Sequence, residues 1–187
     1  MGSPEGEALF RSVYDRHRTD VLAYFLRRLD PETAAEATAD VFLVVWRRIA
    51  ALPPAPEWKP WLFGVARNVL RNRRRLARRL VRLVARAASA PVDPPPQPDT
   101  VVVGRAEGDA LLAALDRLTR ADAEVLRLRQ WEELSFEDVG TALGCSRHAA
   151  EQRYAKALGR LRSAYGRSGH VAVGWTEPVQ SRQERTP

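Results

Sequence analysis

Apolar residues recur along most of the chain at three- and four-residue steps, the spacing that places them on one face of an α-helix. In residues 5–29 this spacing predicts a first helix. Asp30 and Pro31 end it and begin a second helix that runs to about residue 50. We expect the second helix to bury Val41, Phe42, Val45 and Trp46. The same periodicity continues in the C-terminal half, so the fold class expected is all-α.

The segment from Trp58 to Arg86 carries two helical patterns at once. One face is apolar and is expected to be buried: Leu62, Val65, Ala66, Val69, Leu76, Leu80 and Leu83. Another face is basic: Arg67, Arg71, Arg74, Arg75, Arg78 and Arg82. Because no Asp or Glu occurs from Arg67 to Val92, these charges repel one another unless a polyanion lies alongside. The alternative is an ordinary solvated basic face.

Aromatic residues stand just ahead of these arginines, at Trp58, Trp61 and Phe63. Flat aromatic faces beside a cationic track are what single-stranded bases stack on. Trp61 is followed by apolar residues at core spacing, so we expect it to pack inside. Trp58 follows a proline-rich loop that cannot be helical, and it is the better candidate for a base contact.

The composition changes after this segment and divides the chain. Residues 87–104 include PVDPPPQPDT, which predicts an extended, flexible linker. We therefore expect one helical domain over residues 5–86 and a second over 105–165. Residues 166–187 carry no motif and are expected to be a disordered tail.

Residues 135–162 have the pattern of a helix-turn-helix. Ser135 with Asp138 caps a short helix, Gly144 can adopt the left-handed conformation that ends it, and Ser146 caps the next helix. That last helix is expected to bury Ala150, Tyr154, Ala157, Leu158 and Leu161. Its outward face, where such helices meet base edges and phosphates, carries Arg147, His148, Glu151, Gln152, Arg153, Ala155, Lys156 and Arg160. The alternative is a helical hairpin with no role in DNA binding.

Composition excludes several classes of protein. The 187 residues carry a net charge of +7, and residues 1–90 hold 17 basic against 9 acidic side chains. A single cysteine, Cys145, and three separated histidines predict neither an internal disulfide nor a metal site. No apolar run approaches the ~20 residues that span a bilayer, and no signal peptide is evident, so a cytoplasmic protein is expected. No phosphate-binding loop or nucleophile–base pair is present, so we expect neither an enzyme nor a bound cofactor.

Taken together, both halves resemble the extracytoplasmic-function sigma factors of bacterial RNA polymerase, members of the sigma-70 family. AAEATADVFLVVW (34–46) resembles their polymerase-binding helix, and WKPWLFGVARNVLRNRRR (58–75) resembles the segment that opens and reads the minus-10 element. Residues 118–162 resemble the domain that reads the minus-35 element. The resemblance implies a region 2 helical bundle and a region 4 helix-turn-helix, joined here by the proline-rich linker.

The resemblance also assigns residues to partners. Those facing core polymerase are Glu36, Asp40 and Arg47, and those facing minus-10 DNA are Trp58, Lys59, Arg67, Asn68, Arg71, Asn72 and Arg75. Those facing minus-35 DNA are Ser146, Arg147, His148, Glu151, Gln152, Arg153 and Lys156. The family usually has Gln where this chain has Ala39, and often has Thr, Val and Lys where it has Ala149, Ala150 and Glu151. A promoter sequence is therefore not transferred from relatives.

The function implied is that of a sigma factor, which binds the beta-prime clamp and beta flap of core polymerase and directs it to promoter DNA. Whether an anti-sigma protein is a further partner stays open. One alternative is a helix-turn-helix transcriptional regulator that uses only residues 105–165 and dimerises through its N-terminal half. Another is an RNA-binding protein that uses the arginine-rich helix alone. Neither alternative needs both Trp58 and an unpaired arginine stripe alongside a helix-turn-helix.

Overall fold

The fold is all-helical in a computed structural model that describes residues 3–88 and 106–167. The helices are α1 (Pro4–Leu26), α2 (Pro31–Arg47), α3 (Trp58–Ala88), α4 (Ala106–Asp116), α5 (Arg120–Gln130), α6 (Phe136–Leu143) and α7 (Arg147–Gly166). Two short 3-10 turns, η1 (Ile49–Ala51) and η2 (Ala55–Glu57), lie between α2 and α3. No strand occurs in these two ranges, and the predicted all-α class is confirmed.

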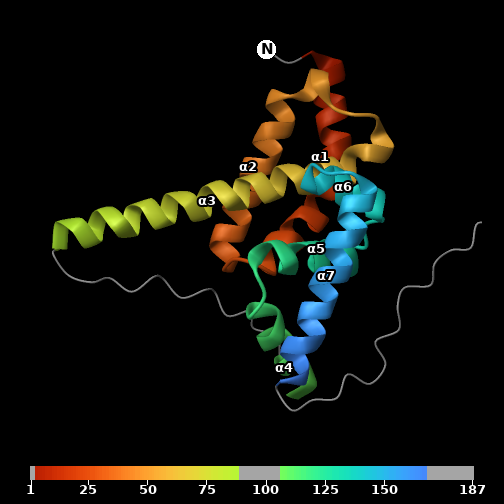
Figure 1. The fold of residues 1–187 in the computed structure, drawn as a ribbon. Coiled ribbons are helices and arrows are strands. Elements are labelled where there is room, and N and C mark those ends of the chain that lie inside the picture. Colours follow the sequence, from red (N-terminus) through yellow and green to blue (C-terminus); the bar gives the residue numbers. More distant parts are fainter. Residues whose placement is uncertain (1–2, 89–105, 168–187) are drawn as a thin grey trace, which may run out of the picture.

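Helices α1, α2 and the first half of α3 form the N-terminal half of the molecule (Figure 1). Pro31 opens α2, and the Asp30 carboxylate caps it by accepting a hydrogen bond from the Thr33 amide at 3.0 Å. The core of this half is apolar and aromatic: Val13, Val21, Phe25, Val41, Phe42, Val45, Leu62 and Phe63. Trp46 was predicted to join this core, but it is 38% exposed because it lies at the outer edge of α2, against Phe10.

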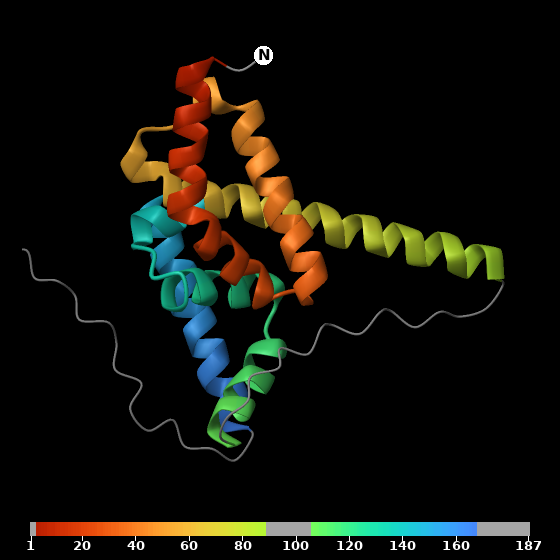
Figure 2. The same cartoon turned by 180° about the vertical axis from the view of Figure 1, so that it is seen from behind.

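Helix α3 extends far beyond the bundle that supports its first half (Figures 1 and 2). Among the side chains of α3 that the structure describes, Leu70 is the last buried one. The prediction that Leu76, Leu80 and Leu83 are buried is wrong, since their exposed fractions are 59%, 61% and 61%. The apolar periodicity is real, but α1 and α2 cross α3 instead of running along it, so they cover only its first half (Figure 1).

The C-terminal half consists of α4 to α7, with α5 and α6 both packed on α7. Its turns have the expected caps. The Thr119 hydroxyl accepts from the Asp122 amide at 3.2 Å, and Ser135 with Asp138 forms a complete capping box. The residues predicted for the buried stripe of α7 are buried at Ala150, Tyr154, Ala157 and Leu161, and Leu158 is half-buried.

The two halves pack against each other, with α6 lying on the first half of α3 (Figure 1). Gly64 of α3 faces Ala142 of α6, and a Cβ added at Gly64 would lie in ordinary van der Waals contact with the Ala142 backbone, 3.6 Å from its Cα. One continuous hydrophobic core runs through both halves. The predicted linker and tail lie almost entirely outside the described residues, although α3 continues two residues past the predicted boundary, to Ala88.

Candidate nucleic-acid interface

The helix-turn-helix of α6 and α7 is built by two glycines with different tasks. Gly144 has a φ of 68°, the left-handed conformation that ends α6 and that glycine adopts without strain. Gly140 lies against the turn, where an added Cβ would stand 2.7 Å from the Cys145 carbonyl oxygen. The Ser146 hydroxyl then caps α7 by accepting from the Ala149 amide at 3.2 Å. The turn therefore fixes the angle at which α7 leaves α6.

The predicted base-reading face of α7 is accessible. Ser146, Arg147, His148, Gln152, Arg153 and Lys156 are exposed, and Glu151 is half-buried. Arg147 donates to the Glu151 carboxylate at 2.9 Å, and this pairing raises the pKa of the Arg147 guanidinium. His148 and Gln152 are hydrogen-bonded one helical turn apart at 2.9 Å. These side chains thus present an ordered row of donors and acceptors at the N-terminal end of α7.

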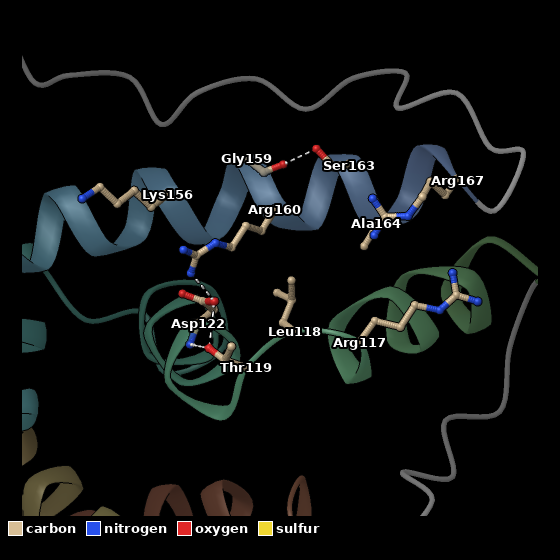
Figure 3. Close-up of a pocket in the computed structure, with 10 residues that line it drawn as sticks. All are labelled: Arg117, Leu118, Thr119, Asp122, Lys156, Gly159, Arg160, Ser163, Ala164 and Arg167. Atoms are coloured by element: carbon tan, nitrogen blue, oxygen red, sulfur yellow. Dashed lines mark hydrogen bonds and ion pairs between the residues drawn. The ribbon is translucent and has the colours of Figure 1, made fainter.

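Arg160, expected at a phosphate, is engaged within the protein instead. Its guanidinium donates to Asp122 at 2.6 Å, and the same carboxylate accepts from the Thr119 hydroxyl at 2.8 Å (Figure 3). Lys156 lies on the same helix, and Figure 3 shows no hydrogen bond or ion pair between it and the other residues drawn. The phosphate-contact candidates on α7 are therefore Arg153 and Lys156.

The predicted minus-10 residues lie along α3. Asn68, Arg71, Asn72 and Arg75 are exposed, and Arg67 is half-buried. No acidic partner is found for these arginines among the residues that the structure describes. Lys59 is half-buried and lines a small cavity with Trp131 and Glu132 of the C-terminal half. The stripe of arginines is thus available to a polyanion, and Lys59 faces the other half.

The expectation that Trp58 is exposed to contact a base is wrong. It is 7% exposed, it begins α3, and its indole nitrogen donates to the Pro53 carbonyl at 3.0 Å. The His17 ring meets it edge-on, with centroids 6.3 Å apart. The proline-rich loop folds back over this tryptophan rather than delivering it to solvent. Trp61, expected in the core, is half-buried and is the more accessible of the two.

The residues predicted to face core polymerase are on α2. Arg73 of α3 donates to Glu36 at 3.0 Å and to Asp40 at 2.6 Å, while Arg47 is exposed. Beside these acids, Leu43 and Trp46 border an apolar groove of about 490 Å³ between α1 and α2. No local pattern indicates the role of Arg73, because its partners lie more than thirty residues earlier in the chain.

A buried charge cluster joins the two halves. The Arg28 side chain is fully buried and donates to Glu124 at 3.3 Å and Glu132 at 3.2 Å, and the Tyr24 hydroxyl donates to Glu124 at 2.8 Å. Burial raises the pKa of Glu132, against the opposing effects of Arg28 and Arg27. Burial, followed by the charge of Glu124, raises the pKa of Tyr24 well above its ordinary value. We name this set the latch cluster: Tyr24, Arg28, Glu124 and Glu132.

We call the packing of the two halves against each other the closed arrangement. It brings residues of both predicted DNA-binding sets to one cavity. Arg67 and Arg71 of α3 and Arg153 of α7 line the same cavity, of about 400 Å³. No group of three or more potential metal ligands occurs in residues 3–88 and 106–167. Within the same ranges, no helix is long and apolar enough to cross a membrane. The basic residues that line this cavity come from both halves of the molecule.

Comparisons with known proteins identify a matching family and similar sequences. The family described as Sigma-70, region 4 matches residues 114–163. RNA polymerase sigma factor NccH of Alcaligenes xylosoxydans xylosoxydans is 30% identical over 125 residues, which cover 65% of this chain and 67% of that protein. ECF RNA polymerase sigma factor SigK of Mycolicibacterium vanbaalenii is 28% identical over 161 residues, covering 84% and 82%.

Solved structures share the fold. The sigma factor RpoE from Bartonella quintana, in complex with the anti-sigma factor NepR, aligns with a TM-score of 0.62 at 19% identity, over 84% of this chain and 96% of that one. CnrH in complex with the cytosolic domain of CnrY aligns with a TM-score of 0.55 at 22% identity, over 84% and 88%. The chain therefore belongs to the extracytoplasmic-function sigma factors of the sigma-70 family.

Proposed function

We propose that this sigma factor directs core RNA polymerase to promoters by reading the minus-35 element with α7 and the minus-10 element with α3. The observation that carries the proposal is that α7 presents an exposed polar face directly after a rigid helix-turn-helix turn. Major-groove readout needs such a face at the N-terminal end of the helix. A regulator that uses only the C-terminal half is not favoured, because the relatives align over both halves.

The minus-10 assignment rests on charge and accessibility. Arg71 and Arg75 are exposed and stand in a stretch without acids. Arginine binds phosphate bidentately, and each phosphate neutralised on a single strand contributes about −0.7 to the slope of log K against log salt. Since Trp58 is buried, Trp61 replaces it as the aromatic candidate near the melted bases.

The polymerase-binding surface is proposed to include Glu36, Asp40 and the apolar groove beside Trp46. An exposed ion pair contributes only about 0–1 kcal/mol, so Arg73 can release both acids to a basic partner at little cost. The similar sigma factor RpoE is solved in complex with the anti-sigma factor NepR, and CnrH is solved in complex with the cytosolic domain of CnrY. We propose that an anti-sigma protein also binds this chain. We further propose that the chain has no enzymatic activity of its own and acts in the cytoplasm.

Promoter binding requires the two halves to separate. Elements centred about 25 base pairs apart lie ~85 Å apart on straight B-DNA. Arg67, Arg71 and Arg153 line one cavity in the closed arrangement, so they cannot reach both elements from it. We therefore propose that the latch cluster opens when the protein engages polymerase and DNA.

Transcription in vitro from a pooled promoter library, with core polymerase and with or without this protein, tests the proposal. We expect initiation that depends on the protein. The double variant Arg71→Ala/Arg75→Ala should weaken open-complex formation, lower the salt slope by about 1.4 and leave polymerase binding intact. Its matched control is Arg11→Ala/Arg79→Ala, at two exposed arginines outside the basic face of α3. Loss of polymerase binding in the first variant would show that the interfaces are misassigned, and no initiation with wild-type protein would overturn the proposal.

A further inference from the structure

The cavity between the halves is lined by an unusual concentration of arginines. It lies between α3 and the C-terminal half, has a volume of about 400 Å³, and receives arginines from three helices: Arg67, Arg71, Arg74, Arg78, Arg120 and Arg153. Leu70 and Leu143 supply apolar wall. We name this cavity the arginine cleft. Its size falls within the ~300–1,000 Å³ typical of small-molecule sites.

The two acids of the arginine cleft are already engaged by groups outside it. Glu124 binds Tyr24 through one carboxylate oxygen and Arg28 through the other. Asp122 accepts from Arg160 and from the Thr119 hydroxyl, and Figure 3 shows its carboxylate turned toward them. Neither acid forms an ion pair with an arginine of the cleft in the part of the chain that the structure describes.

The arginines of the cleft are therefore largely uncompensated. Arg78 donates to the Arg74 backbone carbonyl at 3.2 Å, which leaves its charge unpaired. Burial, followed by the nearby charge of Arg120, lowers the pKa of Arg74. Like charges brought together in a partly desolvated cavity oppose closure unless an anion joins them.

We propose that the arginine cleft binds a chain of phosphates, either inorganic triphosphate or the triphosphate of a nucleotide. Guanidinium groups fit phosphate oxygens bidentately, and arginines from separate helices suit several linked phosphates better than one. Because α3 belongs to one half and Arg120 and Arg153 to the other, a bound chain of phosphates bridges the halves and stabilises the closed arrangement. If the proposed function holds, bound anion also competes with promoter DNA for Arg71 and Arg153.

Calorimetric titration of the full chain with tripolyphosphate and, separately, with ATP, in magnesium-free buffer of low salt, tests the proposal. We expect saturable binding of one anion per chain. Equal affinity for both ligands assigns the site to the phosphates alone, and tighter binding of ATP assigns a contribution to the nucleoside. Arg74→Ala/Arg120→Ala should weaken binding at least tenfold. The control Arg79→Ala/Arg162→Ala removes the same charge at exposed positions outside the cleft and should change binding less than threefold.

Two further measurements keep the test decisive. Circular dichroism checks that each variant is folded, and Arg120→Glu offers a second variant at an exposed side chain. Tripolyphosphate should raise the unfolding temperature of the wild-type protein and not that of Arg74→Ala/Arg120→Ala, because a ligand bound across the halves stabilises the folded, closed arrangement. Absence of saturable binding, or equal loss in the cleft variant and the control, would overturn the proposal. Neither outcome depends on polymerase, so failure here is distinct from failure of the sigma assignment.

Discussion

Removing Arg28 should open the molecule without unfolding its halves. Its side chain is fully buried between Glu124 and Glu132, and the latter is 2% exposed. Breaking a buried pair by removing one partner costs about 3–5 kcal/mol, because the remaining charge stays uncompensated. At ~1.4 kcal/mol per tenfold change, Arg28→Ala should shift the closed-to-open equilibrium about 100- to 4,000-fold toward the open form.

Two other variants at or beside the latch cluster serve as controls for Arg28→Ala. Arg27 pairs with the same Glu132 at 3.1 Å but is 29% exposed, so Arg27→Ala should cost only about 1 kcal/mol or less. The triple variant Arg28→Ala/Glu124→Gln/Glu132→Gln removes all three charges and should recover much of the closed population.

Small-angle scattering measures the opening as a larger radius of gyration, and circular dichroism reports whether the helices persist. We expect Arg28→Ala to expand with its helical signal intact. An unchanged radius of gyration would refute the reasoning, because the cluster would then contribute nothing to closure. Loss of helical signal would refute it as well, since each half would then depend on the contact in order to fold.

Two further predictions concern stability. Gly140→Ala should lower the free energy of unfolding by about 1–3 kcal/mol, since the new Cβ meets the Cys145 carbonyl oxygen. Gly159→Ala should raise the free energy of unfolding by roughly 0.5–1 kcal/mol, because its new Cβ has nothing within 4 Å. Urea titration of both variants measures these changes. His17 has its pKa lowered, chiefly by burial, with Asp20 opposing and Arg16 and Lys59 adding. The contribution of His17 to folding stability is therefore complete above pH ~6.5 and is lost as pH falls through the folded pKa. The unfolding temperature should be lower at pH 5 than at pH 7, and His17→Leu should reduce this difference. An equal difference in wild type and His17→Leu would contradict the prediction.

The parts of the fold that the sequence predicts well are those set by neighbouring residues. The capping box at Ser135, the left-handed Gly144 and the cap at Ser146 all depend on backbone within a few positions, and each forms as expected. The exposed face of α7 follows from the same local periodicity. These features are readable because their physical causes lie inside one turn of chain.

The misses have non-local causes. Trp58 is buried because the Pro53 carbonyl and His17 close around it, and Leu76 is exposed because no other helix of the described chain reaches it. The latch cluster joins residues about a hundred positions apart, and no pattern in either segment predicts the pairing of Arg28 with Glu124. Tertiary packing decides such positions, and periodicity alone does not report it.

The unsupported turns of α3 bear on how this protein behaves in solution. Leu76, Leu80, Leu83 and Val84 form an exposed apolar stripe, and arginines stand beside it on the same turns. At low ionic strength these charges keep two copies apart. The Debye length falls from about 10 Å at 0.1 M salt to about 3 Å at 1 M, so concentrated salt removes that repulsion while leaving the leucines exposed. We therefore expect this helix to be the first place where copies of the chain adhere when the protein is purified in high salt.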